Sequence, residues 1–327
     1  MSRSVTLADV EAAAKLLAGR VHRTPLVSAR SLARPGGELW LKCENLQKVG
    51  AFKARGALHH LLRLTPKQRA QGVATYSSGN HGAALAWAAR ELGTTAMIFV
   101  PGDIPAGKRA AIESYGGRVV VAGRTSSDRR KACEAAAVQD GFRIVPPFDD
   151  PWIVAGQGTC GLEIVEQVGP AGALKRVLVP IGGGGLIAGV ALAVKSRRPD
   201  VEVIGVEPEA AASMSAALAV GRPVEIAVGE TIADGLKPVQ VGALTHALAA
   251  RHVDRVVTVD DAAIRSAMRL LLERCKLVVE PSGAATVAAY LAGAVDAAAG
   301  GAAAGGITVA VLSGGNVDVA RLLGLLG

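Results

Sequence analysis

The chain has few of the features that mark membrane proteins, disulfide-stabilised proteins or zinc proteins. Aromatic residues make up 3% of its 327 residues, and no uninterrupted apolar run is long enough to cross a bilayer. The four cysteines are scattered and form no C-x-x-C pair, which argues against a zinc cluster or a disulfide framework. Residues 1–20 lack the layout of a signal peptide. We therefore predict a cytoplasmic protein with reduced cysteines and no membrane contact.

The basic residues do not form the pattern of a nucleic-acid-binding protein. The net charge is +8, but no compact basic tract is interleaved with aromatic residues. The densest basic group, residues 124–131, has the pattern of a helix that begins on a solvated face. We expect an anionic cofactor and an anionic substrate instead of DNA or RNA.

Small aliphatic residues are abundant, and the alternation of strand-like runs with amphipathic helices predicts an α/β fold. Half of the residues are hydrophobic and 40 are glycine, so we expect closely packed helices and strands. The chain exceeds the usual size of a single core, which predicts two domains that share a cleft. A helix is expected at 7–17, an extended lead-in at 22–26, and a helix end with a surface loop at 292–306. Amphipathic helices separate the expected strands, so the sheets should be parallel with right-handed crossovers. These strands are expected at 38–43, 73–77, 96–100, 118–121, 176–181, 201–207, 255–259 and 307–312.

Lys53 lies in the segment Lys42-Cys43-Glu44-Asn45-Leu46-Gln47-Lys48-Val49-Gly50-Ala51-Phe52-Lys53-Ala54-Arg55-Gly56-Ala57. The lysine follows Phe52 and precedes small residues in a helix-like run. Desolvation of such a lysine weakens its preference for the charged form, which frees the amine to attack a carbonyl and form a Schiff base. Most lysines are solvated surface charges, so Lys53 needs support from other segments.

A glycine loop follows the expected strand at 176–181. Gly182, Gly183, Gly184 and Gly185 precede a helix that should open at Leu186, where free N–H groups and the helix dipole favour an anion. The same residues satisfy G-x-G-x-x-A, and Glu207 follows about twenty residues later, as in a dinucleotide-binding fingerprint. These residues alone leave a phosphate cradle and a nicotinamide site equally supported.

Two further segments carry polar side chains at turns. They are Ser77-Ser78-Gly79-Asn80-His81-Gly82 and Leu312-Ser313-Gly314-Gly315-Asn316-Val317-Asp318. Ser313 ends a buried strand at the edge where parallel sheets bind ligands. Locally, Asn80 is equally typical of a helix N-cap, Ser313 of a turn and Phe52 of a core.

Taken together and in this order, the four segments resemble the fold-type II pyridoxal 5'-phosphate (PLP) enzymes, which are similar to the tryptophan synthase β-subunit. This group includes threonine and serine dehydratases, serine racemase and hydroxyaspartate dehydratase. The resemblance extends from Lys42 to Asp318. It implies a small domain at 72–149 inserted between 1–71 and 150–327, which form the larger PLP-binding domain. It also implies a homodimer, while the C-terminal regulatory domain of some members is not expected.

The resemblance implies a role for each of several residues. Lys53 would bind PLP and then act as the base, and the glycine loop would bind the phosphate. Ser313 would hydrogen-bond the pyridine nitrogen, the Asn80 amide would reach the oxygen beside the Schiff base, and Phe52 would pack by the cofactor. Lys53 and Ser313 favour PLP over the nicotinamide site, since neither has a role in the latter.

The resemblance also assigns the substrate side of the site. Residues Ser77, Ser78, Gly79, Asn80 and His81 would bind the substrate carboxylate at a helix N-terminus. Ser78 matches a serine that faces the substrate opposite the lysine and can pass a proton. We interpret His81 as a positioning residue and not as a general base.

A divalent cation, Mg²⁺ or Ca²⁺, binds serine racemase-like members at positions that match Glu207 and the backbone of Ala211. The third ligand there is an aspartate, and Ser213 stands at that position here. Loss of one carboxylate weakens a site for a hard cation. Glu280 matches a family position near the cofactor.

The predicted activity is dehydration and deamination of L-threonine and/or L-serine to a 2-oxo acid and ammonia. The alternatives are serine racemase and 3-hydroxyaspartate dehydratase, because Val49-Gly50-Ala51-Phe52-Lys53 departs from the commoner Thr-Gly-Ser-Phe-Lys of threonine dehydratases. An oxidoreductase using the glycine loop for a nicotinamide is the alternative from a different class. The expected partner is a small hydroxy amino acid.

Overall fold

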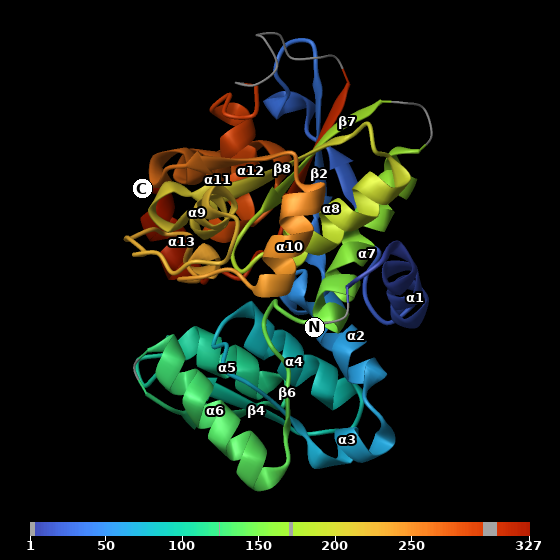
Figure 1. Ribbon diagram of the computed structural model, residues 1–327. Helices are drawn as coiled ribbons and strands as arrows, with labels where there is room; N and C mark the ends of the chain where they lie inside the picture. The colour runs from blue at the N-terminus through green and yellow to red at the C-terminus, as the bar shows by residue number, and fades with distance from the viewer. Residues whose placement is uncertain (1–3, 124, 170–172, 297–305) are drawn as a thin grey trace.

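Two β-sheets organise the chain (Figure 1). The computed structural model describes residues 4–123, 125–169, 173–296 and 306–327. The larger sheet has the strand order β1-β2-β10-β7-β8-β9, and of its described strand pairs only β1/β2 is antiparallel. Its strands are β1 Leu26–Ser28, β2 Glu38–Cys43, β7 Leu174–Pro180, β8 Glu202–Pro208, β9 Arg255–Val259 and β10 Ile307–Leu312.

The smaller sheet is parallel throughout and has the order β5-β4-β3-β6. Its strands are β3 Val73–Thr75, β4 Ala96–Val100, β5 Arg118–Val121 and β6 Arg143–Ile144. Helices α4 Asn80–Glu91, α5 Ala106–Ser114 and α6 Ser126–Asp140 accompany it, and Figure 1 shows this part below the larger sheet. All four strands lie inside 72–149, although the domain boundaries themselves remain a prediction.

Helices cover both faces of the larger sheet. One core beneath it contains residues of β8, β10, α11 and α12, and the opposite core contains residues of β7, α7 and α8. The remaining helices are α1 Leu7–Leu17, α2 Lys53–Arg63, α3 Pro66–Gln71, α7 Pro151–Val168, α8 Gly185–Arg197, α9 Ser213–Val220, α10 Ala243–His252, α11 Asp261–Cys275, α12 Pro281–Leu291 and α13 Val319–Leu326. Short 3-10 helices are η1 Arg30–Leu32, η2 Glu44–Leu46, η3 Lys48–Gly50, η4 Glu209–Ala211 and η5 Asp234–Leu236.

Glycines let the central helices approach each other. A Cβ added to Gly189 of α8 would lie 2.4 Å from the carbonyl oxygen of Val154 in α7. A Cβ on Gly156 of α7 would lie 2.7 Å from the Cα of Gly56 in α2. Since real Cβ atoms do not approach so closely, the high glycine content is what brings α2 and α8 against α7.

Most expected elements agree with the structure. The α/β prediction is confirmed, as are the helix at Leu7–Leu17 and the strand at Ile307–Leu312. The extended lead-in 22–26 runs into β1, which begins at Leu26, and β6 was not expected. The expected helix in 124–131 starts at Ser126. Residue 124 and residues 297–305, part of the expected surface loop, lie outside the described residues.

Within the described ranges, no helix combines the length and the apolarity needed to cross a bilayer.

Candidate active site

The candidate residues gather at one edge of the larger sheet. Lys53 comes after β2, Gly182 after β7 and Ser313 after β10, and these three strands are neighbours and parallel. Because the carboxyl ends of parallel strands meet at the same edge, their following loops converge. This edge faces the part of the molecule that contains the smaller sheet (Figure 1).

Lys53 is the first residue of α2, and its amine is enclosed. The Nζ donates to the carbonyl oxygen of Pro147 at 2.6 Å and lies 5.1 Å from the centroid of the Phe52 ring. Although part of the residue stays exposed, burial of the amine lowers its pKa from 10.5 to about 8. A useful fraction of the amine is therefore neutral near neutral pH.

The segments of Lys53 and Ser313 are bonded to each other. The N–H of Phe52 donates to the carbonyl oxygen of Ser313 at 3.0 Å, and Ala51 forms a β-bridge with Gly314. Ser313 is buried, with 3% of its surface exposed. Its position relative to Lys53 is thus fixed by the backbone.

Val49, just before this contact, has an unusual backbone. Its φ is 54°, which is uncommon for a β-branched residue. The Nδ2 of Asn316 donates to the Val49 carbonyl at 2.8 Å and stabilises this conformation. At the next position, a Cβ on Gly50 would lie 2.4 Å from the Oδ1 of Asn316, so only glycine fits.

The glycine loop has the form of an anion cradle. Gly184 has φ 92° and precedes α8, and a Cβ on Gly183 would lie 2.2 Å from the Phe148 ring. In the described part of the chain, the N–H groups of residues 182–185 donate to no protein acceptor. Free N–H groups at the positive end of α8 suit a phosphate.

A second set of free N–H groups lies at the start of α4. Those of Ser78, Gly79 and Asn80 have no acceptor among the described residues. A Cβ on Gly82 would lie 2.2 Å from the carbonyl oxygen of Ser77, so glycine is required for the turn. Ser77 and Ser78 are half-buried, which leaves this helix terminus accessible to a small anion.

His81 points into the protein. It is 1% exposed, and its Nε2 donates to the carbonyl oxygen of Val145 at 3.1 Å. Burial, together with the positive charge of Lys53, lowers the pKa of His81 to about 3. The imidazole is therefore neutral and is bonded to Val145, the residue that follows β6. This arrangement favours the interpretation of His81 as a positioning residue.

Asn80 joins the two parts of the molecule. Its Nδ2 donates to the Oε1 of Glu280 at 2.8 Å, and its Oδ1 accepts from the Nδ2 of Asn316 at 2.8 Å. Burial, and to a smaller extent the charge of Asp234, raises the pKa of Glu280 to about 7. Sequence reasoning assigned no role to Glu280, and the structure shows that its carboxylate holds the Asn80 amide.

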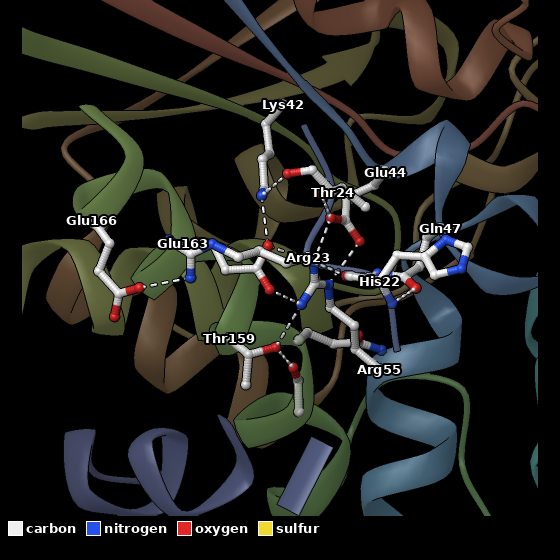
Figure 2. A network of polar contacts seen from close by, with 12 residues as sticks. His22, Arg23, Thr24, Lys42, Glu44, Gln47, Arg55, Thr159, Glu163 and Glu166 are labelled. Atoms are coloured by element: carbon white, nitrogen blue, oxygen red, sulfur yellow. Dashed lines mark hydrogen bonds and ion pairs between the residues drawn. The ribbon is translucent and has the colours of Figure 1, made fainter. Parts of the chain in front are cut away.

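A buried ion network, which the sequence did not reveal, anchors α2 (Figure 2). Arg55, two residues after Lys53, bonds both oxygens of Glu44 at 2.8 and 2.7 Å and both oxygens of Glu163 in α7 at 2.7 and 2.9 Å. Lys42 bonds Glu163 at 2.6 Å and the carbonyl oxygen of Thr24 at 2.8 Å. Two cations face two anions, so the network is neutral as a whole.

The electrostatics of this network follow from its pairing. Burial alone would raise the pKa of Glu44, but the adjacent Arg55 guanidinium outweighs burial and lowers it. Burial likewise opposes the charge on Arg55, and Glu44 and Glu163 raise its pKa above the ordinary value. The paired charges fix the first turn of α2, which carries Lys53.

The residues predicted to bind a cation have other partners. One oxygen of Glu207 accepts from the Met214 N–H at 2.7 Å, and the other accepts from the N–H and the hydroxyl of Ser215 at 2.9 and 2.7 Å. Glu207 thus stabilises the first turn of α9. Ala211 is buried in η4, and Ser213 is buried at the start of α9. Among the described residues, no group of three or more His, Cys, Asp or Glu side chains could hold a metal ion.

Comparisons with known proteins agree with this geometry. A family model described as pyridoxal-phosphate dependent enzyme matches residues 17–314, and the chain belongs to that family. The L-threo-3-hydroxyaspartate ammonia-lyase of Saccharomyces cerevisiae is 39% identical over 322 residues, which are 98% of this chain and 96% of the relative. The L-threonine ammonia-lyase of Thermotoga maritima is 40% identical over 316 residues, 96% of this chain and 76% of the relative.

A solved structure is similar over the whole fold. The serine racemase of maize superposes with a TM-score of 0.92 and 36% identity, over 98% of this chain and 97% of the other. The predicted family, fold class and dependence on PLP are therefore confirmed. The alternatives left open by the glycine loop are decided in favour of PLP and against a nicotinamide.

The residues present fit PLP. A buried amine of lowered pKa suits its aldehyde, and the glycine loop suits its phosphate. A buried serine follows β10, and its backbone is bonded to Phe52 beside the amine. Sequence reasoning missed the Pro147 carbonyl that accepts from Lys53 and the ion network of Arg55. Both join segments about 100 positions apart in the chain, so no local pattern indicates them.

Proposed function

We propose that the chain is a PLP-dependent ammonia-lyase that converts L-threonine and/or L-serine to a 2-oxo acid and ammonia. The observation that carries this proposal is the desolvated amine of Lys53 together with two sets of free helix N-terminal N–H groups, at α8 and at α4. One set suits the cofactor phosphate and the other suits the carboxylate of an amino acid. The Thermotoga maritima relative supports the lyase activity by its name.

Each predicted site residue receives a role in this proposal. Bound PLP supplies an electron sink for the electrons left when the α-proton is removed. Lys53 holds the cofactor and then removes the α-proton, and Ser78 holds a proton on the opposite face. The remaining roles are cofactor contacts of Phe52, Asn80, Gly182, Gly183, Gly184, Gly185 and Ser313, and substrate contacts of Ser77, Ser78, Gly79, Asn80 and His81.

The electronic argument for elimination comes from Ser313. A neutral hydroxyl facing the pyridine nitrogen, in place of a carboxylate, would leave that nitrogen largely unprotonated and weaken the electron sink. Elimination of a β-hydroxyl tolerates a weaker sink better than transamination does. Ser313 therefore favours dehydration.

Two other activities have support from relatives. The Saccharomyces cerevisiae relative is an L-threo-3-hydroxyaspartate ammonia-lyase, and a serine racemase of Schizosaccharomyces pombe is 39% identical over 97% of this chain. Threonine and 3-hydroxyaspartate differ from serine by a methyl and a carboxylate on the β-carbon. A binding site discriminates for or against one methyl by only about 1–3 kcal/mol. We place both activities second to the dehydration of threonine and serine.

A substrate panel tests the proposal. PLP-loaded protein is supplied separately with L-threonine, L-serine, L-threo-3-hydroxyaspartate and D-serine, and ammonia, the 2-oxo acid and the enantiomer of residual substrate are measured. We expect equimolar 2-oxo acid and ammonia from threonine or serine. Lys53→Ala should abolish product, whereas Lys67→Ala, at an exposed lysine of α3, should not. D-serine formed from L-serine faster than ammonia, or product from hydroxyaspartate alone, would overturn the assignment.

We also propose that the protein acts as a homodimer without a required divalent cation. The dimer is implied by the resemblance to the family. The weakness of the cation site is supported by Ser213 and by the contacts of Glu207 with α9. Sedimentation and chelation measurements test the two statements separately.

A further inference from the structure

Three consecutive residues contact both halves of the cofactor site. The carbonyl of Pro147 accepts from the Lys53 amine at 2.6 Å. The Phe148 ring packs against Gly183, where an added Cβ would lie 2.2 Å from a ring carbon. Asp149 reaches past the loop to the N-terminus of α10. This segment lies between β6 and α7, where the chain passes from the smaller sheet back to the larger one.

Asp149 holds the first turn of α10. Its Oδ1 accepts from the N–H groups of Leu244 and Thr245 at 3.0 and 3.2 Å, and its Oδ2 accepts from that of Ala243 at 3.1 Å. A Cβ on Gly242 would lie 2.1 Å from the carboxylate, so glycine is required for this approach. The carboxylate comes from a distant segment and not from the residue that precedes the helix.

Thr245 transmits this contact to the glycine loop. Its hydroxyl is buried and donates to the Gly183 carbonyl oxygen at 2.8 Å, and the Gly242 N–H donates to the same hydroxyl at 3.1 Å. In a trans peptide the C=O and N–H point in opposite directions. With the Gly183 oxygen held by α10, the Gly184 N–H must point away from α10.

The glycine loop needs such an anchor. Residues without a Cβ sample many backbone conformations, so consecutive glycines do not fix the direction of their own N–H groups. The N–H groups of residues 182–185 have no protein acceptor within the described ranges, so hydrogen bonds of their own do not orient them. The Gly183 carbonyl attaches the loop to α10 through the Thr245 hydroxyl at 2.8 Å, and it also accepts a longer contact from the Gly242 N–H at 3.5 Å.

We infer that Asp149 and Thr245 are positioning residues that orient the glycine loop for the cofactor phosphate. Neither residue needs to touch the phosphate, because the effect passes through the Gly183 carbonyl. The inference rests on the proposed function, in which Lys53 and the glycine loop bind the same PLP molecule. It predicts a selective loss of affinity for the phosphate group.

The experiment compares PLP with pyridoxal, which lacks the phosphate. Apoprotein variants Asp149→Ala, Asp149→Asn, Thr245→Val and Thr245→Ser are titrated with each compound, with inorganic phosphate as a competitor. Asp260→Ala serves as the control, since Asp260 caps α11 through the Ala263 N–H and lies outside the site. Thermal unfolding of each apoprotein reports general damage.

We expect Asp149→Ala and Thr245→Val to weaken PLP binding about tenfold or more, while pyridoxal binding changes by about twofold or less. Thr245→Ser keeps the hydroxyl and should bind PLP like the wild type. Asp149→Asn retains the Oδ1 contacts, so its affinity for PLP should lie between those of the wild type and of Asp149→Ala. The control should change neither affinity.

Two other results would overturn the inference. One is equal weakening of PLP and pyridoxal binding, which indicates a general structural role, and the other is unchanged PLP binding. Failure of the proposed cofactor site gives a different result, because the wild type would then not prefer PLP to pyridoxal. If Asp149→Ala does not fold, the Thr245 pair decides the question.

Discussion

At the residue scale, the chemistry of Lys53 depends on its surroundings. The amine donates to one carbonyl oxygen and has no carboxylate partner in the part of the chain that the structure describes, so burial lowers its pKa to about 8. A lysine in water, with a pKa near 10.5, is almost entirely charged at pH 8. The enclosed position thus makes an ordinary side chain a competent nucleophile.

This pKa predicts how PLP attaches to the apoprotein. The rate of attachment, followed by the visible absorbance of the bound cofactor, should rise with pH through an inflection near 8, because only the neutral amine reacts. Lys53→Ala should lose the visible band while its thermal unfolding stays near that of the wild type. An inflection near 10, or borohydride fixation of PLP on another lysine, would contradict the assignment.

Glu280 predicts a pH dependence of stability. Its pKa rises from 4.5 to about 7 on folding, so the unfolded chain loses this proton first and Glu280 lowers the stability progressively between these pH values. Glu280→Gln keeps an oxygen for Asn80 but has no proton to lose. The unfolding free energy of the variant minus that of the wild type should therefore be up to about 3 kcal/mol larger at pH 8 than at pH 4.

Denaturant unfolding of the apoproteins at both pH values measures this effect. Glu273→Gln, at an exposed position of α11, is the control and should show no such gain. A difference between Glu280→Gln and the wild type that is the same at pH 4 and pH 8 would show that Glu280 is ionised normally.

At the scale of elements, α2 is fixed by charges that lie behind it. Removing one member of a buried ion pair costs about 3–5 kcal/mol because the partner charge is left uncompensated. Arg55→Met should therefore lower the unfolding free energy by roughly this amount. It should also weaken PLP binding, because the first turn of α2 carries both Arg55 and Lys53.

Arg176 provides a matched control for Arg55. It is also buried and pairs with Glu202 and Asp296, but it lies near the start of β7, away from the glycine loop. Arg176→Met should lower stability without changing the affinity for PLP, measured by titration of the folded apoprotein. Equal effects of the two variants on PLP binding would show that the Arg55 network has no particular connection to the site.

Glu207 gives a prediction about metal. Its two oxygens accept three hydrogen bonds from the first turn of α9, and Ser213 supplies no carboxylate. Chelation with EDTA should change the activity and the melting temperature little. An intact site that binds only the folded state would add stability by mass action, so a large drop in melting temperature, reversed by Mg²⁺ or Ca²⁺, would contradict this expectation.

Features that depend on residues close together in the chain could be predicted from the sequence, whereas contacts between distant segments could not. The helix at Leu7–Leu17 and the strand at Arg255–Val259 have local patterns, and both were predicted with their observed bounds. The family was predicted from four short segments that each carry their own chemistry. The contacts of Arg55 with Glu163 and of Asp149 with α10 span 108 and 96 positions at most, and no local pattern indicates them. Burial then decides the charge of Lys53, His81 and Glu280, which composition cannot show.

At the scale of the whole molecule, the site is divided between two parts. The loop 77–81 belongs to the part with the smaller sheet, whereas Lys53 and the glycine loop follow strands of the larger one. Asn80 bonds Glu280 and Asn316 across this division, and Lys108 of α5 bonds Asp234 of η5 at 2.5 Å. The relative position of the two sheets therefore determines whether substrate and cofactor groups meet.

The Lys108–Asp234 ion pair connects the two parts of the molecule but should contribute little to the unfolding free energy. Lys108 and Asp234 have 37% and 34% of their side chains exposed, and such ion pairs contribute about 0–1 kcal/mol. Lys108→Met should accordingly change the unfolding free energy by less than about 1 kcal/mol. Because it loosens the contact between the two parts, it should raise the KM for the amino acid severalfold with a smaller effect on kcat. Arg109→Met is the control, since Arg109 pairs with Glu113 within the same helix and does not cross the division. Steady-state kinetics of both variants decide the matter: equal KM values for the two would show that the ion pair has no part in bringing the two halves of the site together.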